Sequence, residues 1–523
     1  MNRGWVVACL ACLAIIASAV IAPAGGAAPQ VKAPQNLLAD SHWQYQFNRS
    51  RTFLDRAPMV QGGEVALIYA RTSFDVDDPA RYVALEFKPG LDPRQKMHFR
   101  LNGQVVPVPE MGMYYWTIPA IPPSLLKAGN NTLEAFISYD NRPPVSKPKL
   151  EMPDVFVELQ ESLLGLEAGD LRFIVGPVLG CCDQGSFSVT CRTNIPSTVA
   201  LKAVADAGQE GAEVAWSKPG LFHRFKVARD AAVKSYQLVG ELNGYTTTAP
   251  FDAPAAPTGR RFVIMGDSRT YPEDWLVVAE AAKQAKPEFV IFNGDMTDAG
   301  RDDWRWECNF FTPGADLMAT VPLYAVWGNH EEKAPVFTKY FYTPGKDGAD
   351  HNWAQQFGPV LIIGIDGQEE WTPASRNAKW LEKTLAESKA KFIFVNSHYP
   401  AYSTGYHGRQ DGRGLVIERE MRRSRVVIVP LLIKYKATAF VVGHDHFYER
   451  SELPGGLTQV ITGGAGAPLL NKNDKKQNPY AKAVAYKLHY TLLEVHGDTC
   501  TLKAITPSGQ IIDQTSWKAR TVK

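Results

Sequence analysis

The sequence has little net charge, little cysteine and no long apolar run after its N-terminal segment. Its 56 Lys and Arg residues nearly balance 54 Asp and Glu residues, which leaves a formal net charge of +2. This balance lacks the basic excess that accompanies binding to nucleic acid or another polyanion. We therefore expect no nucleic-acid partner, and no membrane span in the body of the chain.

Cysteine is sparse, with 7 in 523 residues. The spacing of those beyond residue 28 resembles no zinc ribbon. In an exported protein Cys181 or Cys182 could form a local disulfide with Cys191, while the odd number leaves at least one thiol free. We interpret these cysteines as structural or inert.

The N-terminus has the pattern of an export signal. Arg3 precedes an apolar stretch at residues 5–21, and a small-residue segment at residues 22–28 follows it. We predict a signal peptide at residues 1–28 and a protein exported to the periplasm or the cell exterior. An uncleaved membrane anchor is the alternative, since the apolar stretch is nearly long enough to span a bilayer.

The length of the chain predicts two to four domains, of which the first, at residues 37–150, has an all-β pattern. Short alternating runs are separated there by Gly, Pro and Asp turns. The Asn102-Gly103 turn and the Gly129-Asn130 turn before a strand loosely resemble galactose-binding-like jelly rolls. That resemblance implies either contact with carbohydrate or simple packing against a neighbouring domain.

A second β pattern covers residues 165–252, and a proline-containing hinge at residues 253–258 follows it. We predict a small sandwich. Its position directly before the next domain resembles the fibronectin III-like domain that precedes the catalytic domain of purple acid phosphatases. Its strands are expected near residues 187–191, 199–204, 222–227 and 235–242.

From residue 260 onward the pattern changes to strand, loop and helix, which predicts an α/β fold. Continuously apolar runs of the buried-strand type alternate there with helical stretches near residues 273–284, 378–389 and 425–434. Ligands in such folds gather beyond the carboxyl ends of the strands. The predicted strands are residues 262–265, 289–292, 323–326, 360–365, 392–395 and 440–442.

Five short motifs follow five of these strands. Each alone is weak, because an isolated Gly-Asp is usually a turn and a lone His is usually not a ligand. Together they supply the carboxylate, amide and imidazole groups that two adjacent divalent metals require. The motifs contain Asp267, Asp295, Asn329 with His330, His398, and His444 with His446.

These motifs resemble the calcineurin-like metallophosphoesterase superfamily, on its purple acid phosphatase side, over residues 258–515. The resemblance implies a four-layer β-sandwich with outer helices and two divalent or mixed-valence ions of Fe, Mn or Zn. It implies that Asp295 bridges both ions and that His330 handles a proton at the leaving oxygen. Asp267 and His446 would complete the first ion's ligands, and Asn329, His398 and His444 would hold the second.

Two positions depart from the superfamily pattern. Arg269 stands where the commonest form has a histidine ligand, and Asp298 stands where purple acid phosphatases have a tyrosine. Arginine cannot lose its proton to become a ligand, so the first ion would be weakly held. We expect Arg269 to turn away from the metals and grip a phosphate oxygen, or else to pair with an acid such as Asp302 or Asp303. Asp298 is much shorter than tyrosine, so it would reach a metal only through water, or merely orient its neighbours.

The loop at residues 399–414 follows the His398 motif, and loops above strand ends often line substrate pockets. We predict Tyr402 and His407 as substrate contacts, with a purely solvated loop as the alternative. The predicted function is an exported dinuclear-metal phosphoesterase that hydrolyses phosphate mono- or diesters through a metal-bound hydroxide, without a covalent intermediate. The alternative is a cell-envelope binding protein with a degenerate metallophosphoesterase site.

Overall fold

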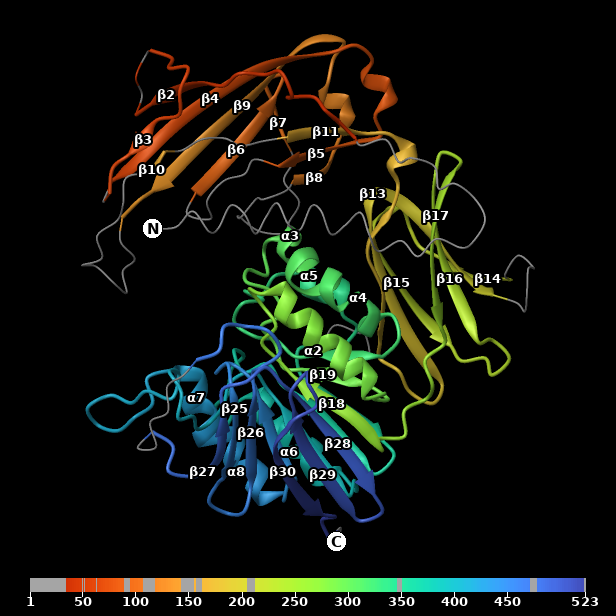
Figure 1. Cartoon of the computed structure of the whole chain (residues 1–523), viewed down its shortest axis with the longest axis vertical. Helices are drawn as coiled ribbons and strands as arrows, with labels where there is room; N and C mark the ends of the chain where they lie inside the picture. Colours follow the sequence, from red (N-terminus) through yellow and green to blue (C-terminus); the bar gives the residue numbers. More distant parts are fainter. Residues whose placement is uncertain are drawn as a thin grey trace.

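The computed structural model describes residues 34–521 except 49, 51, 63, 89–94, 107–117, 143–154, 157–161, 205–211, 346–349 and 471–476. The predicted signal peptide lies outside the described residues. Figure 1 shows an N-terminal β region, a second β region and a larger part with helices and strands, in chain order. None of the helices within the described ranges is long and apolar enough to cross a membrane.

Two antiparallel sheets form the first β region and enclose a core that includes Ile68, Phe99 and Leu163. At the Asn102-Gly103 turn both residues have positive φ (52° and 79°), as a two-residue hairpin requires. One sheet has the order β2 (Gln44–Phe47), β4 (Val65–Val76), β9 (Gly129–Asp140), β6 (Gln95–Leu101), β7 (Gln104–Val105). The other has the order β1 (Gln35–Asn36), β11 (Ser162–Leu166), β5 (Ala84–Lys88), β8 (Ile118–Ile121), and β3 (Met59–Val60) pairs separately with β10 (Val155–Phe156).

The second β region is built on one long strand, β13 (Ser186–Val204). The prediction of two separate strands at residues 187–191 and 199–204 is wrong, because the polar residues between them are buried and remain extended. A register shift between Arg192 and Ser197 marks the junction. The strands that complete the region are β12 (Phe173–Gly180), β14 (Ala212–Trp216), β15 (Gly220–Ala228), β16 (Ser235–Leu242) and β17 (Tyr245–Asp252).

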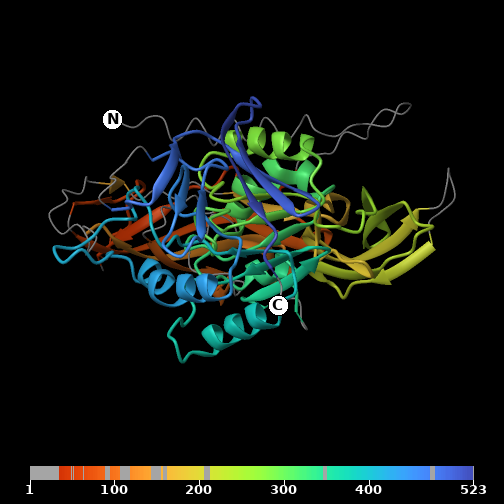
Figure 2. The same ribbon diagram turned by 90° about the horizontal axis from the view of Figure 1, so that it is seen from below.

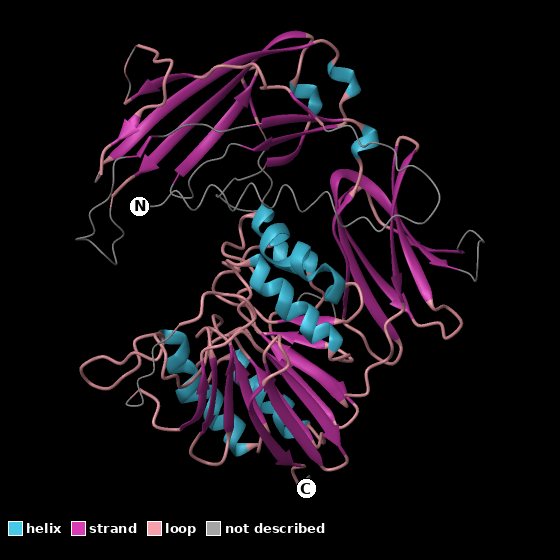
Figure 3. Ribbon diagram, in the orientation of Figure 1, coloured by secondary structure: helices cyan, strands magenta, loops and turns pink. Residues whose placement is uncertain are grey.

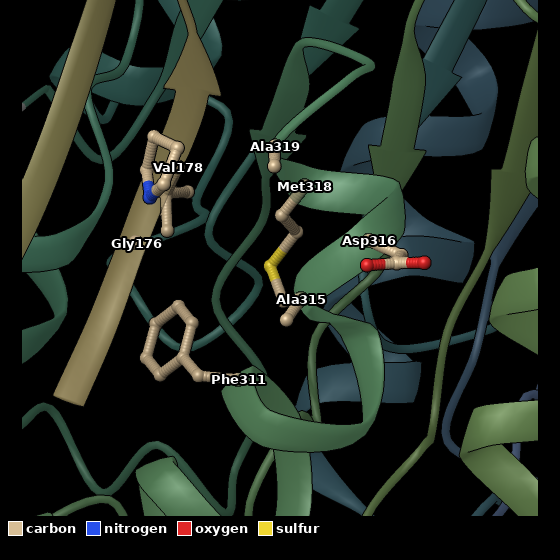
Figure 4. Close-up of a pocket in the computed structure, with 8 residues that line it drawn as sticks. Gly176, Val178, Phe311, Ala315, Asp316, Met318 and Ala319 are labelled. Atoms are coloured by element: carbon tan, nitrogen blue, oxygen red, sulfur yellow. The ribbon is translucent and has the colours of Figure 1, made fainter. Parts of the chain in front are cut away.

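The same buried polar residues attach the second β region to the larger part of the chain. Arg192 forms a buried ion pair with Asp303, and the Tyr340 hydroxyl donates to Asp303 Oδ1 at 2.9 Å. Val178 of β12 joins the apolar core beneath the helices. Figure 4 shows a small cavity at this contact, between β12 and α4 (Thr312–Met318). Apolar side chains make up most of its lining, and it contains none of the predicted metal ligands.

All five cysteines within the described residues are free thiols, so the local disulfide considered above is wrong. Cys182 instead accepts a hydrogen bond from Arg229, and Cys191 is buried in the core of the second β region. Burial raises the pKa of Cys182 to about 11 and that of Cys181 to about 12. Both thiols therefore stay protonated and unreactive near neutral pH.

Two mixed sheets form the larger part, and the parallel strands of both carry the predicted motifs. The six-stranded sheet has the order β20 (Leu323–Ala325), β19 (Val290–Phe292), β18 (Arg261–Met265), β28 (Tyr490–His496), β29 (Thr499–Ile505), β30 (Ile511–Lys518). The seven-stranded sheet has the order β21 (Trp353–Phe357), β22 (Val360–Gly364), β23 (Phe392–Asn396), β24 (Ala439–Val442), β26 (Thr458–Thr462), β25 (Tyr448–Glu452), β27 (Ala481–Ala485).

The two sheets pack face to face, because Phe262 and Leu493 of one share a core with Phe394 and Val460 of the other. Helices α2 (Pro272–Gln284) and α4 cover the outer face of the six-stranded sheet, and α6 (Arg376–Glu387) and α8 (Val429–Lys434) cover that of the seven-stranded sheet. Figure 2 shows helices on both sides of the strands, and Figure 3 shows that the longer helices lie in this part, with short helices among the strands of the N-terminal β region. The predicted α/β part and the antiparallel β regions before it are confirmed.

The predicted helix at residues 425–434 is the end of a longer helical run of three segments, α7 (Arg419–Arg423), the π-helical η5 (Ser424–Ile428) and α8. The prediction misses its start because charged residues fill the first segment. The remaining short helices are η1 (Pro79–Arg81), η2 (Pro123–Leu125), η3 (Ala168–Asp170), α3 (Asp303–Arg305), η4 (Trp306–Phe311) and α5 (Val336–Tyr340).

Candidate metal centre

The five motifs converge at one edge of the paired sheets. They follow the carboxyl ends of β18, β19 and β20 in one sheet and of β23 and β24 in the other. Because parallel strands end at a common edge, residues far apart in the chain become neighbours there. Two groups of mutually close potential ligand atoms result: Asp295 with His398 and His444, and Asp267 with Asp295 and His446.

The backbone at this edge is unusual at three of these positions. Asp267, Asp295 and His444 have φ values of 63°, 55° and 75°, in a region that side-chain-bearing residues seldom occupy. Such strain persists where the surroundings fix it, often at functional sites. Gly328 and Gly443 leave necessary space, since a Cβ at Gly328 would collide with Asp295 and one at Gly443 with the Asp267 carboxylate.

The ligands predicted for the second ion, Asp295, Asn329, His398 and His444, form what we call the second set, and Asp267, Asp295 and His446 form the first set. Four potential ligand atoms face one another in the second set. His398 Nε2 lies 2.9 Å from Asn329 Oδ1, 3.0 Å from His444 Nδ1 and 3.3 Å from Asp295 Oδ1. His398 is fully buried and His444 is 5% exposed, so bulk water does not separate these groups. A divalent cation that accepts nitrogen and oxygen ligands fits such a donor set.

The outer nitrogen of each histidine faces an acceptor, which directs the other nitrogen inward. His398 Nδ1 donates to Asn293 O at 2.8 Å, and His446 Nδ1 donates to Pro468 O at 2.9 Å. His444 Nε2 faces a Glu418 carboxylate oxygen at 2.8 Å. Outer partners of this kind fix the tautomer and the ring orientation of histidines that bind metals.

Burial sets the charge states of the cluster. It raises the pKa of Asp267 to about 8 and lowers the pKa of both His444 and His446 to about 3, which keeps these rings neutral, as metal ligation requires. At His398 burial is outweighed by the Asp295 and Asp267 carboxylates, which raise its pKa to about 10. The carboxylates thus favour positive charge at this point, which a metal cation would supply.

The first set contains Asp267, Asp295 and His446, with His446 Nε2 at 3.7 Å from Asp267 Oδ1. Contrary to our expectation, Arg269 points into this set rather than away from it, with Nε at 3.5 Å from Asp295 Oδ2. Its other acidic neighbour is Asp298, at 3.4 Å. The predicted alternative, that Arg269 pairs with an acid, is therefore confirmed, but with other partners than those named: Asp302 pairs with Arg305, and Asp303 pairs with Arg192.

The other predicted residues divide into those beside the cluster and one that is not. His330 Nε2 lies 4.0 Å from Asp295 Oδ2, and its side chain is 30% exposed. The His407 ring lies against His444, with ring centroids 3.8 Å apart. Tyr402 packs instead against Arg425 and the Tyr480 ring. The structure therefore brings His330 and His407 to the centre and places Tyr402 in a supporting contact.

Two buttressing glutamates were missed by the sequence analysis. Glu331 is fully buried, and its carboxylate accepts backbone N–H groups of Asp295, Met296 and Gly328 at 3.0, 2.8 and 2.6 Å. Glu418 contacts both His407 and His444 through its two oxygens. Glu331 follows the Asn329-His330 pair and could have been considered, but Glu418 lies in a segment with no motif, and only the fold brings it to the centre.

We predict that Glu418→Ala weakens metal binding by the Asn329, His398 and His444 set by about 10-fold, because His444 loses the carboxylate that orients it. Equilibrium dialysis against Zn²⁺, with metal counted by elemental analysis, measures this change. Glu420→Ala is the matched control, because Glu420 lies two residues further along the chain, inside α7, and pairs with Arg419. Equal affinity in the Glu418 and Glu420 variants would rule out the orienting role.

Comparison with known proteins agrees with the motifs. Residues 260–448 match the family described as calcineurin-like phosphoesterase. The chain is 26% identical to the Fe(3+)-Zn(2+) purple acid phosphatase 12 of Arabidopsis thaliana, an alignment that covers 40% of this chain and 48% of that protein. Tartrate-resistant acid phosphatase type 5 of Oryctolagus cuniculus is 31% identical over 257 residues, which are 41% of this chain and 75% of the rabbit protein.

Among solved structures, purple acid phosphatase PPD1 from yellow lupin seeds aligns with 92% of this chain and 96% of its own, with a TM-score of 0.56. At 15% sequence identity this likeness concerns the fold alone. The chain spans only about half of the Arabidopsis relative, so the activity of that whole protein does not transfer directly.

Proposed function

Because this chain belongs to the calcineurin-like phosphoesterase family, whose members are metal-dependent phosphoesterases, we propose that it hydrolyses phosphate mono- or diesters. The observation that carries the proposal is the convergence of Asp295, Asn329, His398 and His444. Their four ligand atoms meet in a buried space where the outer nitrogens of both histidines are already hydrogen-bonded. This arrangement suits a cation and serves no evident purpose in packing.

The residues present fit two ions, which we propose to be Fe, Mn or Zn because the ligands mix carboxylate, amide and imidazole. Asp295 belongs to both sets, so its two oxygens are suited to bridge them. When bound, paired divalent cations polarise a phosphoryl group and lower the pKa of coordinated water. Hydrolysis by this route requires no covalent enzyme intermediate.

When its ring carries a proton on both nitrogens, His330 is suited to give the Nε2 proton to the leaving oxygen. Its Nδ1 faces Asp298 O at 2.7 Å, which makes Nδ1 the donor there and directs Nε2 toward the cluster. The ring is partly exposed, so a substrate can reach it. His407 lies against the ring of His444 and is proposed as a substrate contact, with its Nδ1 held by Glu418. In this proposal His330 acts as a positioned general acid and His407 as a positioned hydrogen-bond donor.

Three further proposals concern the whole chain. We propose that it is exported, on the pattern of residues 1–28. We also propose a jelly-roll-like first domain at residues 37–150 and a fibronectin III-like second domain at residues 165–252, on the antiparallel sheets seen in each. The jelly-roll-like first domain supports a secondary proposal, that this domain contacts carbohydrate.

A second candidate function is a cell-envelope binding protein with an incomplete metal centre. The inward position of Arg269 favours it, because a fixed cation beside Asp295 disfavours a second positive ion. This candidate predicts metal binding without turnover.

Hydrolysis assays with and without metal distinguish the two. We expect the protein to hydrolyse bis(p-nitrophenyl) phosphate or p-nitrophenyl phosphate, to lose at least about 100-fold in rate after chelation, and to regain activity with Mn²⁺, Zn²⁺ or Fe²⁺. Rates compared between the two substrates assign the diester or monoester preference. Metal-replete protein that hydrolyses neither compound would favour the binding protein instead.

A further inference from the structure

The Arg269 guanidinium lies among Asp295 and His446, which belong to the first set, and the neighbouring Asp298. Nε is 3.5 Å from Asp295 Oδ2, Nη1 is 3.4 Å from Asp298 Oδ1, and Nη2 is 3.5 Å from His446 Nε2. The side chain is 20% exposed. Since His446 donates its Nδ1 proton to Pro468 O, its Nε2 lone pair faces the guanidinium. All three contacts thus join a cation to an electron-rich atom.

Neighbouring contacts hold the guanidinium in this place. The Thr270 hydroxyl donates to Asp298 Oδ1 at 2.7 Å, and Arg305 Nη1 donates to Asp298 Oδ2 at 3.1 Å. Arg305 is itself paired with Asp302 at 3.3 Å. The backbone N–H of Arg269 also donates to Asp295 O at 3.3 Å. Both ends of the arginine are therefore tied to the loop that follows β19.

The two oxygens of Asp295 consequently face different partners. Oδ1 faces His398 Nε2 at 3.3 Å, within the second set, and Oδ2 faces Arg269. Arginine keeps its proton in proteins, so its charge is permanent. A metal ion bound by Asp267, Asp295 and His446 would lie close to this charge in a buried, poorly screened space, and the repulsion would be strong.

We propose that Arg269 supplies one of the two positive charges of this centre. The Asn329, His398 and His444 set then holds its ion tightly, and the Asp267 and His446 set holds its ion weakly. This inference rests on the proposed function, and it makes the enzyme work with one resident ion and a second that binds only when abundant. Arg269 would also present N–H donors to a phosphoryl oxygen that approaches Asp295 and Asp298.

Metal titration of the purified full chain tests the inference. After chelation, Mn²⁺ binding is followed by equilibrium dialysis with elemental analysis and by electron paramagnetic resonance, which distinguishes single from coupled Mn²⁺ ions. The wild type should bind one ion tightly and the second at least about 100-fold more weakly. Arg269→Met removes the charge at similar length and should tighten the weaker site by at least about 10-fold. Arg269→His adds a ligand and should give two ions and a coupled signal.

Two variants serve as controls. Arg269→Lys keeps the charge and should bind metal like the wild type. Arg305→Met removes a neighbouring charge whose contacts are Asp298 and Asp302, and should change the weaker site less than Arg269→Met does. Two equal, tight sites in the wild type, or an unchanged weaker site in Arg269→Met, would overturn the inference. Absent hydrolysis with unequal metal sites would instead count against the proposed function alone.

Discussion

Replacing Asp295 by alanine should lower kcat/KM for bis(p-nitrophenyl) phosphate by at least about 10³-fold and remove metal from both sets. Asp295 is the one residue that belongs to both groups of ligand atoms. It is 1% exposed, and Oδ1 also accepts the His330 backbone N–H at 2.9 Å. Its loss therefore removes the shared ligand and loosens the loop that carries Asn329 and His330.

Steady-state kinetics and elemental analysis of the same preparations measure these effects. Asp295→Asn keeps the size of the side chain and should lose nearly as much activity, because the amide lacks the negative charge. Asp316→Ala is a suitable control, since that side chain is 86% exposed on α4. Near-wild-type turnover in Asp295→Ala would refute the catalytic role of the centre.

The second large effect is expected at Glu331, where alanine should lower the free energy of unfolding by about 3 kcal/mol. Its carboxylate accepts three backbone N–H groups, from Asp295, Met296 and Gly328. Removing it leaves these buried donors unsatisfied, at a cost of about 1 kcal/mol or more each. Because Asp295 and Gly328 belong to ligand-bearing loops, turnover should also fall by about 100-fold through displacement of the ligands.

Denaturant unfolding of Glu331→Ala measures the loss in the free energy of unfolding, and steady-state kinetics measure the fall in turnover. Glu332→Ala is matched in sequence and charge, and it should alter stability by no more than about 0.5 kcal/mol, because the Glu332 hydrogen bond to the Arg301 N–H is exposed. The free energy of unfolding of Glu331→Gln should lie between those of Glu331→Ala and Glu332→Ala. The amide oxygen can still accept a hydrogen bond, whereas the amide NH₂ faces a donor. A fully stable and active Glu331→Ala protein would show that the loops hold without the carboxylate.

Six of the thirteen strands described in the α/β part were predicted, whereas β21 and β25 to β30 were not. Each predicted strand there lies within two residues of an observed one, because strands buried on both faces are short continuous apolar runs. The motif residues were predictable for the same reason, since each follows such a run directly. By contrast, Arg192, Thr193 and Asn194 read as a polar break, and only burial against the neighbouring part keeps β13 continuous there.

The orientation of Arg269 shows the limit of reasoning from residue type. Its position two residues after Asp267 indicated a non-ligand near the centre, but the sequence could not say which way a long, flexible side chain points. The answer depends on Asp298, which Thr270 and Arg305 hold in place from separate segments. Glu418 is a similar case, because it reaches His444 across 26 residues of chain.

By itself, the sequence determined the alternation of strands and helices and the identity and order of the candidate metal ligands, because both depend on local pattern and residue chemistry. Only the tertiary structure decided which atoms face one another: that Asp295 divides its oxygens between His398 and Arg269, and that Glu331 and Glu418 support the centre. Such contacts depend on how the ends of two packed sheets meet, and that long-range geometry leaves no trace in the spacing of residues along the chain.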